Sequence, residues 1–269
     1  MSTIGFIGSG NMAEALIKGI ISAGLYKPAN IFISDIRQGR LKQLAKKYKV
    51  KPAKDNSVLA DKADIVVLSV KPQSMAEALE SIKGTVGGKK LVISIAAGVR
   101  TGRIAAVLGN VAIVRAMPNT PALIGEGASA LFANAKAKPM LKKAKAIFAA
   151  VGQVVVVENE GLIDAVTAVS GSGPAYYFLL MEEMIKTACK LGLPDDVAKD
   201  LVFQTAKGAA LLAVEADGRC ESPAQLRQKV TSPGGTTEAA LKVLAKGKFG
   251  PLVEAAIKKA RDRSRELSA

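Results

Sequence analysis

A glycine-rich loop near the start of the chain constrains the fold more than any other feature of the sequence. The β-rich run Thr3–Ile7 leads into Gly8-Ser9-Gly10-Asn11-Met12-Ala13, which opens an apolar-periodic helix. Gly8 permits a tight turn, Gly10 lets the backbone approach a pyrophosphate, and Ala13 allows close helix–strand packing. Free N–H groups at the helix start are suited to phosphates, although a turn could need its glycines for geometry alone. The predicted cofactor-binding residues here are Gly8, Ser9, Gly10, Asn11 and Met12.

Short β-rich runs alternate with helical patterns through the first 160 residues. The predicted strands are Thr3–Ile7, Ile31–Ser34, Ile65–Val70, Leu91–Ile95, Ala112–Arg115, Ala128–Phe132 and Gln153–Val157. The predicted crossover helices are Asn11–Ala23, Gly39–Lys47, Ser74–Lys83, Thr101–Leu108 and Pro139–Val151. Continuously apolar strands are typical of a parallel sheet that is buried on both faces. We therefore predict an α/β fold with a Rossmann-type doubly wound sheet.

Strand signals stop after about residue 160, and the second half of the sequence is expected to be all-α. The helical patterns cover Gly161–Leu191, Pro194–Ala216, Pro223–Val230, Thr236–Ala245 and Phe249–Leu267. Pro174 falls within the first of these, so we expect that segment to break or bend there. The predicted domains are a dinucleotide-binding domain over residues 1–160 and a helical domain over residues 161–269.

The residues that close the second predicted strand bear on which nicotinamide dinucleotide fits. An acid there binds the ribose 2′-hydroxyl of NAD, whereas an Arg nearby accommodates the 2′-phosphate of NADP. Ser34-Asp35-Ile36-Arg37 supplies a hydroxyl, an acid and a cation. We predict NADPH, with Ser34 and Arg37 at the cofactor, and leave NADH open because Asp35 is an acid at this point. The alternative for Asp35 and Arg37 is turn chemistry and a solvated cation. Asn56 is a candidate contact to the adenosine half, or equally an Asx-turn or helix-cap residue.

Two further segments are candidate cofactor contacts because they lie at the carboxyl ends of predicted strands. Ligands of doubly wound sheets bind outside these strand ends. Val70-Lys71-Pro72 and Ala96-Ala97-Gly98 follow two of these strands, and their small residues leave room for a ring. Met117-Pro118-Asn119-Thr120-Pro121 is a dense polar loop suited to face the nicotinamide. The additional predicted cofactor contacts are Val70, Lys71, Pro72, Ala97 and Asn119.

The residue types that are missing or scarce exclude several kinds of enzyme. The chain has no His, which rules out a Ser-His-Asp triad, a Cys-His pair and a histidine metal site. Its two cysteines, Cys189 and Cys220, are too few for a disulfide framework or a four-thiolate zinc site. We therefore expect free thiols, no metal and a reducing compartment.

Composition indicates a globular protein, and the net charge brings anionic partners into consideration. Hydrophobic residues make up 49% and charged residues 23%, with a mean hydropathy of +0.23. The net charge of +15 brings nucleotides, acidic metabolites, lipid surfaces and nucleic acid into consideration. No signal-peptide pattern is present, and no apolar run reaches the roughly 18 residues that a spanning helix needs. We predict a cytoplasmic protein without a membrane partner.

A second glycine cluster precedes a helical pattern in the second half of the sequence. Thr231-Ser232-Pro233-Gly234-Gly235-Thr236-Thr237-Glu238 places glycines and hydroxyls at a helix start, where free N–H groups hold a carboxylate without a cationic side chain. The alternative is an ordinary Ser or Thr N-cap with Glu238 in the first turn. Local sequence alone favours this alternative, because such caps are common.

Five motifs together resemble the pyrroline-5-carboxylate reductase family over nearly the whole chain. They are Gly5-Phe6-Ile7-Gly8-Ser9-Gly10-Asn11-Met12-Ala13, Val70-Lys71-Pro72, Met117-Pro118-Asn119-Thr120-Pro121, Ser170-Gly171-Ser172-Gly173-Pro174-Ala175-Tyr176 and Ser232-Pro233-Gly234-Gly235-Thr236-Thr237. The last is the most specific, whereas many dehydrogenases share the first. The resemblance implies reduction of 1-pyrroline-5-carboxylate to L-proline by NADPH or NADH, the last step of proline synthesis.

The resemblance also implies which residues meet this cyclic imine. The N–H groups of Gly234 and Gly235 would bind its carboxylate, and the Thr237 hydroxyl would bond the ring nitrogen as an orienting and proton-relaying catalytic residue. Glu160 matches a position near the substrate, where its charge would stabilise the iminium, or it is simply an acid in the first turn of a helix. The implied substrate-binding residues are Glu160, Val230, Thr231, Gly234, Gly235, Thr236 and Thr237.

In this family the helical half builds an interlocked homodimer, and dimers often assemble into decamers. The substrate loop of one subunit then meets the dinucleotide of its partner. The sequence departs from the family pattern at Asp35, which leaves the cofactor preference open, and in its many surface lysines.

Two rival interpretations start from other features of the sequence. The opening Gly5-Phe6-Ile7-Gly8-x-Gly10-x-Met12 also resembles β-hydroxyacid dehydrogenases. Their catalytic Lys after a glycine cluster is missing, because Ser170-Gly171-Ser172-Gly173 is followed by no Lys before Lys186. A dinucleotide sensor or nucleic-acid-binding protein would use the net charge directly, but aromatic residues are only 4% and no such motif is present, so we predict no nucleic-acid partner.

Overall fold

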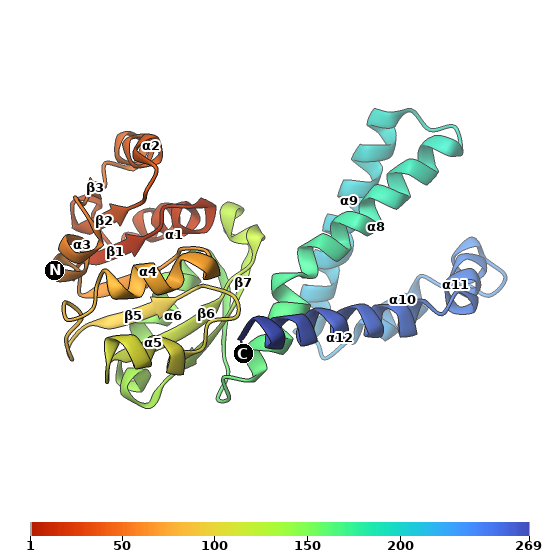
Figure 1. The fold of residues 1–269 in the computed structure, drawn as a ribbon. Helices are drawn as coiled ribbons and strands as arrows, with labels where there is room; N and C mark the ends of the chain where they lie inside the picture. Colours follow the sequence, from red (N-terminus) through yellow and green to blue (C-terminus); the bar gives the residue numbers. More distant parts are fainter. Residues whose placement is uncertain (1, 269) are drawn as a thin grey trace. The chain divides into compact units, whose positions relative to one another are not determined.

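The computed structural model describes residues 2–268, which form two compact units (Figure 1). The first unit holds the chain up to Pro174 together with the segment that begins at Lys259. The second unit is Ala175–Lys258. The compact units therefore divide after Pro174, some fifteen residues beyond the predicted boundary near Glu160, and the end of the chain returns to the first unit.

The first unit is built on an eight-stranded sheet. Its strands are β1 (Ile4–Ile7), β2 (Ile31–Ser34), β3 (Lys51–Pro52), β4 (Ile65–Leu68), β5 (Leu91–Ser94), β6 (Ala112–Met117), β7 (Gly127–Ala133) and β8 (Gly152–Val156). Their spatial order is β3-β2-β1-β4-β5-β6-β7-β8, with β1 to β6 all parallel. The first six follow the strand order of dinucleotide-binding folds, so the predicted fold class is confirmed.

Helices cover both faces of the sheet (Figure 1). On one face, α1, α2 and α6 pack through residues such as Leu16, Leu44 and Phe148, and on the other α3, α4 and α5 pack through residues such as Leu59 and Ile104. The helices are α1 (Asn11–Ser22), α2 (Gln38–Tyr48), α3 (Asn56–Lys62), α4 (Met75–Glu80), α5 (Thr101–Leu108) and α6 (Leu141–Ala149). The continuously apolar central strands are thereby buried on both sides, as expected from their sequence.

The sheet differs from the predicted elements in two places. β7 runs antiparallel to β6, because the two strands are joined by a short connection around the 3-10 helix Thr120–Ile124, whereas a parallel connection needs a crossover of a dozen or more residues. β8 is parallel to β7 again, after α6. The short strand β3 and the helix α3 were not predicted, since β3 has two residues and both are exposed.

The long helical segment predicted from Gly161 is interrupted ahead of Pro174. It consists of α7 (Leu162–Val166), a π-helical turn at Thr167–Gly171 and α8 (Gly173–Lys190). The predicted break is confirmed, and Pro174 lies in the first turn of α8, where its missing N–H removes no helical hydrogen bond.

The remaining helices are α9 (Asp195–Asp217), α10 (Pro223–Lys229), α11 (Thr236–Lys246) and α12 (Phe249–Ser268), the last of which continues into the first unit. Among residues 2–268, no helix is both long and apolar enough to cross a membrane.

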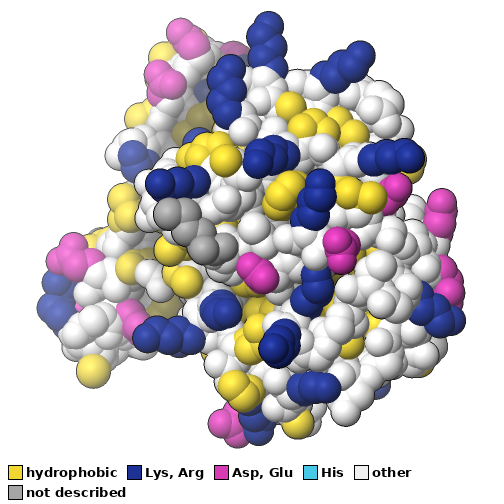
Figure 2. All heavy atoms as spheres, turned by 90° about the vertical axis from the view of Figure 1, so that its left-hand side faces the viewer, with side chains coloured by type: hydrophobic (Ala, Val, Ile, Leu, Met, Phe, Trp, Pro, Cys, Tyr) yellow, Lys and Arg dark blue, Asp and Glu magenta, His cyan; other side chains and the backbone are white. Residues whose placement is uncertain are grey.

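Positive charge is concentrated in the first unit. It carries 27 of the Lys and Arg residues against 13 Asp and Glu, whereas the second unit carries 11 against 10. Figure 2 shows one face of the molecule, on which Lys and Arg side chains outnumber acidic ones. The +15 is therefore almost entirely a property of the sheet-containing unit.

Candidate functional site

The glycine loop has the geometry of a phosphate cradle. Gly8 has φ +89, and a Cβ on it would lie 2.8 Å from the Ser69 carbonyl oxygen, so a side chain there is excluded twice. A Cβ on Gly10 would meet nothing within 4 Å, which leaves open space beside the loop. α1 begins directly after Gly10 without a side-chain cap. Its first N–H groups are therefore available to an anion, and the loop fits the pyrophosphate of a dinucleotide.

The register of the sheet aligns the predicted cofactor residues along one edge. Ile7 pairs with Ser34 and with Leu68, and Leu68 pairs with Ser94. The residues that follow these positions include the glycine loop, Val70-Lys71-Pro72 and Ala97. The Ser69 hydroxyl donates to the Gly8 carbonyl oxygen at 2.6 Å, which ties the end of β4 to the loop. The structure thus brings these predicted residues to a common edge.

Ser34 and Asn56 are joined directly. The Ser34 hydroxyl donates to Asn56 Oδ1 at 2.5 Å, and Asn56 Nδ2 donates to the Ser81 hydroxyl at 3.0 Å. Asn56 is the first residue of α3, but the cap is Asp55, whose side chain accepts from the Val58 N–H at 2.8 Å. The helix-cap alternative considered for Asn56 is therefore taken by its neighbour.

Asp35 and Arg37 form an ion pair after β2. Arg37 Nε lies 2.9 Å from Asp35 Oδ1, and the Arg37 side chain is 61% exposed against 6% for Asp35. Hydrogen bonds from the Arg37 guanidinium hold the pKa of Asp35 at about 2, so the acid is ionised at neutral pH. Arg37 is thus presented to solvent at the edge where a 2′-phosphate would be expected.

Asn119 supports the backbone around the π-helical turn. Its Nδ2 donates to the Ser170 carbonyl oxygen at 3.2 Å, and its Oδ1 accepts from the Ala128 N–H at 2.8 Å. Both ends of the amide therefore hold protein groups in this structure. Its contact with a nicotinamide stays a prediction, although π-helical turns of this kind are frequent at functional sites.

A buried ionic cluster lies beside Glu160. The Arg115 side chain on β6 is 1% exposed, with Nη1 3.4 Å from Glu160 Oε1 and Nη2 3.8 Å from Asp164 Oδ1. Glu160 also accepts from the Thr101 N–H at 2.7 Å and the Thr101 hydroxyl at 2.8 Å. These contacts favour a supporting role for Glu160 at the start of α7. Sequence reasoning missed Arg115, and the signal was a cation inside an otherwise apolar strand.

The second glycine cluster lies in the second unit, at the start of α11. Gly234 has φ +71, and its N–H donates to Glu238 Oε2 at 2.8 Å. The Gly235 N–H donates to the Ser232 carbonyl oxygen at 3.0 Å, and Gly235 is the N-cap without a side-chain cap. The Ser or Thr N-cap considered from sequence is therefore wrong. Instead, the Glu238 carboxylate accepts from the Gly234 N–H, a group predicted to bind the substrate carboxylate.

The electrostatics of this loop suit an anion. The Gly234 N–H and the Lys242 ammonium lower the pKa of Glu238. Thr237 lies in the first turn of α11, half-buried, and no described residue forms a hydrogen bond with its hydroxyl. Val230 and Thr231 precede the loop, where the Thr231 hydroxyl donates to the Arg227 carbonyl oxygen at 2.6 Å. The Thr237 hydroxyl is thus free to bond a ligand.

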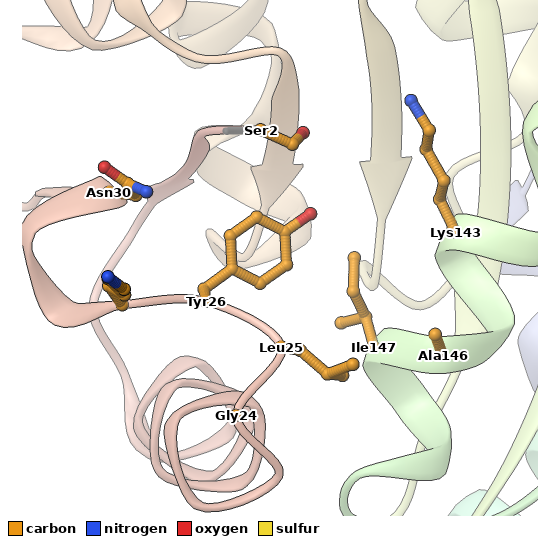
Figure 3. Close-up of a pocket in the computed structure, with 9 residues that line it drawn as sticks. Ser2, Gly24, Leu25, Tyr26, Asn30, Lys143, Ala146 and Ile147 are labelled. Atoms are coloured by element: carbon orange, nitrogen blue, oxygen red, sulfur yellow. The ribbon is translucent and has the colours of Figure 1, made fainter.

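A separate hollow lies away from the glycine loop (Figure 3). It measures about 420 Å³ and is lined by residues that include Leu25, Tyr26, Lys143 and Ile147. It lies beside the segment that leads into β2, at the amino ends of the strands, opposite the edge where doubly wound sheets bind ligands. Across residues 2–268, no cluster of Cys, Asp and Glu is placed to hold a metal ion.

Comparisons with known proteins cover both halves of the chain. Residues 160–267 match the family description "Pyrroline-5-carboxylate reductase dimerisation", and residues 3–98 match "NADP oxidoreductase coenzyme F420-dependent". The helical half is therefore an oligomerisation region by similarity. The pyrroline-5-carboxylate reductase of Pseudomonas aeruginosa is 44% identical over 100% of this chain and 98% of its own length.

Solved structures of pyrroline-5-carboxylate reductases are also similar to this chain. A pyrroline-5-carboxylate reductase from Coxiella burnetii has a TM-score of 0.92 at 44% identity, covering 100% of this chain and 99% of that one. The Plasmodium falciparum pyrroline carboxylate reductase, solved with NADP bound, has a TM-score of 0.89 at 32% identity, covering 100% and 98%. These similarities favour the reductase family over the β-hydroxyacid dehydrogenase alternative. The chain belongs to the pyrroline-5-carboxylate reductase family.

Proposed function

We propose that the protein reduces 1-pyrroline-5-carboxylate to L-proline with NAD(P)H, the last step of proline biosynthesis. The observation that carries the proposal is the full-length 44% identity to a reductase of this name. The chain's own residues fit the chemistry, since one loop offers a phosphate cradle and another already binds a carboxylate.

The dinucleotide is proposed to lie at the carboxyl edge of the sheet. The N–H groups that open α1 hold its pyrophosphate, and Gly10 leaves the space that this needs. When bound, the nicotinamide supplies the hydride for the imine carbon. The other residues proposed to contact it are Ser34, Arg37, Asn56, Val70, Lys71, Pro72, Ala97 and Asn119.

The substrate carboxylate is proposed to bind the N–H groups of Gly234 and Gly235. Support comes from the Glu238 carboxylate, which already accepts from the Gly234 N–H at 2.8 Å and must turn away as the substrate enters. The Gly235 N–H must likewise turn from the Ser232 carbonyl oxygen, to which it donates at 3.0 Å. Val230 and Thr231 precede this loop in the chain and Thr236 follows it, and all three are proposed to complete the pocket.

Thr237 is proposed to orient the ring nitrogen of the imine. Its hydroxyl has no partner among the described residues, so it is free to donate or accept a hydrogen bond. The chain has no His, and none is required, because an imine takes its proton from solvent and the iminium accepts hydride readily. Thr237 has too high a pKa to serve as a general acid alone, so its role is positioning and proton relay.

Two copies of the chain are proposed to build each site as an interlocked homodimer, with decamers as the larger assembly. Apolar side chains on α8 and α9 support this, because Tyr177, Phe178, Leu211 and Val214 are exposed within a single copy.

We further propose residues 1–160 and 161–269 as the functional domains, supported by the dimerisation match that starts at residue 160. A cytoplasmic location is supported by the unpaired Cys189 and Cys220.

Thr237 provides the test of this site. Thr237→Ala is expected to lower kcat/KM for 1-pyrroline-5-carboxylate by roughly tenfold or more, whereas Thr237→Ser restores most of it because the hydroxyl returns. The Kd for NADP⁺, measured by calorimetry, is expected to stay within about twofold. Equal kcat/KM for Thr237→Ala and the unmodified protein would remove Thr237 from the mechanism.

A further inference from the structure

Asp35 stands where a dinucleotide-binding fold often places the acid that reads the adenosine ribose. It directly follows β2, and an acid at this point ordinarily accepts a hydrogen bond from the ribose 2′-hydroxyl. In this structure the carboxylate faces the glycine loop instead, because Asp35 Oδ2 accepts from the Ser9 N–H at 2.8 Å. The Asp35 carboxylate is therefore already bound to the glycine loop that forms the phosphate cradle.

The hydrogen-bonding capacity of the Asp35 carboxylate is fully used within the protein. Oδ1 accepts from the Arg37 N–H and from Arg37 Nε, both at 2.9 Å. Oδ2 accepts from Arg37 Nη2 at 2.9 Å as well as from Ser9. An ionised carboxylate offers about four lone-pair sites, and these four donors fill them. No acceptor position remains for a ribose hydroxyl.

Asp35 is one of several groups that fix the glycine loop from the side of β2. The Gly8 N–H donates to the Ser34 carbonyl oxygen at 2.8 Å, and the Ser9 hydroxyl donates to the same oxygen at 3.2 Å. Arg40 Nε donates to the Ser9 carbonyl oxygen at 2.8 Å. Both the N–H and the carbonyl group of Ser9 are thereby held, which keeps the free N–H groups of α1 aimed at the open space before Gly10.

The same contacts set the orientation of Arg37. Asp35 binds its Nε and Nη2, whereas Nη1 takes no part in this pair, and the side chain is 61% exposed. The pairing also offsets the negative charge of Asp35, which would otherwise repel a 2′-phosphate. The edge thus lacks a free acid for a ribose hydroxyl and presents a fixed cation to a phosphate.

We propose that Asp35 is a positioning residue that braces the glycine loop and orients Arg37, so that the site selects a dinucleotide with a 2′-phosphate over one with a free 2′-hydroxyl. The proposal rests on the proposed function only for the class of its ligand, a nicotinamide dinucleotide. Asp35 then influences both cofactors through the loop, and Arg37 carries the discrimination between them.

The test measures binding of NADP⁺ and NAD⁺ separately by calorimetry, without the imine substrate. Asp35→Asn removes the charge while keeping the shape. Both Kd values are expected to rise by roughly tenfold, the size of one charge-assisted hydrogen bond to the loop, and the Kd for NADP⁺ is expected to rise further because Arg37 is no longer held in place. Asp61→Asn is the matched control, since it makes the same charge change on the exposed side of α3, and both Kd values are expected to stay unchanged. Thermal melts of each variant report whether the fold is intact.

A second variant keeps the proposal testable if Asp35→Asn unfolds. Arg37→Met frees the two acceptor positions on Asp35 that Nε and Nη2 occupy and removes the cation, so the preference is expected to move toward NAD⁺ by roughly tenfold or more. The main-chain N–H of residue 37 remains, so at least two positions become available to a ribose.

Two results would overturn the proposal. One is a loss of NAD⁺ binding alone in Asp35→Asn, which would make Asp35 the ribose acceptor; the other is unchanged binding of both cofactors. Failure of the proposed function is distinguishable, because it would leave dinucleotide binding intact while no imine-dependent oxidation of the cofactor occurs.

Discussion

Removing the charge of Asp164 is expected to destabilise the first unit by about 3–5 kcal/mol, because it leaves the buried Arg115 without one of its two counter-charges. The Asp164 side chain is 2% exposed and Arg115 is 1% exposed. Burial lowers the pKa of Arg115, and the nearby charges of Glu160 and Asp164 act in the opposite direction to keep it protonated. Among the described residues, Arg115 Nε and Nη2 have no hydrogen-bond partner, so the cation depends on these charges.

The magnitude follows from the geometry. Asp164 Oδ1 lies 3.8 Å from Arg115 Nη2, and two unit charges at this separation interact by about 4 kcal/mol at an effective dielectric constant of about 20. Asp164→Asn keeps the size of the side chain and its ability to accept from the Ser264 hydroxyl, which lies 2.8 Å away. The variant therefore isolates the charge from the packing.

The assay is urea unfolding of the full chain at fixed protein concentration, followed by far-UV circular dichroism. Ser264→Ala, which removes only the hydrogen bond to Asp164, is expected to lower the free energy of unfolding by about 1 kcal/mol. Arg115→Met combined with Asp164→Asn is expected to recover most of the loss, because no buried cation remains. Stability of Asp164→Asn within about 1 kcal/mol of the unmodified protein, or a double variant no more stable than the single one, would show that the buried Arg115 does not depend on the charge of Asp164.

Three further predictions concern acid, salt and the substrate loop. Burial raises the pKa of Glu14, but hydrogen bonds from Lys47, Arg40 and Tyr48 outweigh it and hold the value at about 2, as Arg37 does for Asp35. A carboxyl group whose pKa is lower in the folded state stabilises the protein fully at pH values above its unfolded-state pKa, and this stabilisation is lost as the pH falls toward its folded-state pKa. The free energy of unfolding should therefore fall by roughly 2–3 kcal/mol as the pH drops from about 4.5 to 2. Urea unfolding at stepped pH measures this loss, and a free energy of unfolding that does not change with pH would contradict the prediction. Because the first unit carries 27 basic against 13 acidic residues, the KM for NADPH should rise several-fold, about three to ten times, between 50 and 500 mM salt in steady-state assays, and a salt-independent KM would argue against electrostatic attraction. Glu238→Ala removes the carboxylate on the Gly234 N–H and should lower the KM for 1-pyrroline-5-carboxylate with little change in the KM for NADPH; a raised substrate KM would mean that Glu238 assists binding.

The parts of the fold that the sequence predicts are those governed by local chemistry. The strand, turn and helix around Gly8 follow from glycine conformation and apolar periodicity, and each lies as expected. The short strand at Lys51–Pro52 has no periodicity to read, since both residues are exposed, and it forms only because β2 offers it hydrogen bonds. The reversal at β7 depends on the length of its connection to β6, which the apolar pattern of β7 does not reveal.

The candidate site is less accessible to sequence reasoning, because its important contacts join residues that are distant in the chain. Asp35 meets the Ser9 N–H, 26 residues away, and Glu160 meets Thr101, 59 residues away. Residue type alone could not say that both acids would be occupied by protein donors. The contact between Glu238 and Gly234 is local, but a carboxylate and a glycine N–H four residues apart fit many helix starts.

The most direct test follows the absorbance of the reduced cofactor at 340 nm with 1-pyrroline-5-carboxylate, giving NADPH and NADH in separate runs with the purified protein. We predict rapid oxidation that depends on the imine, formation of L-proline in equal amount, and a higher kcat/KM with NADPH than with NADH. No imine-dependent oxidation with either cofactor, by protein shown to bind the dinucleotide, would contradict the proposed function.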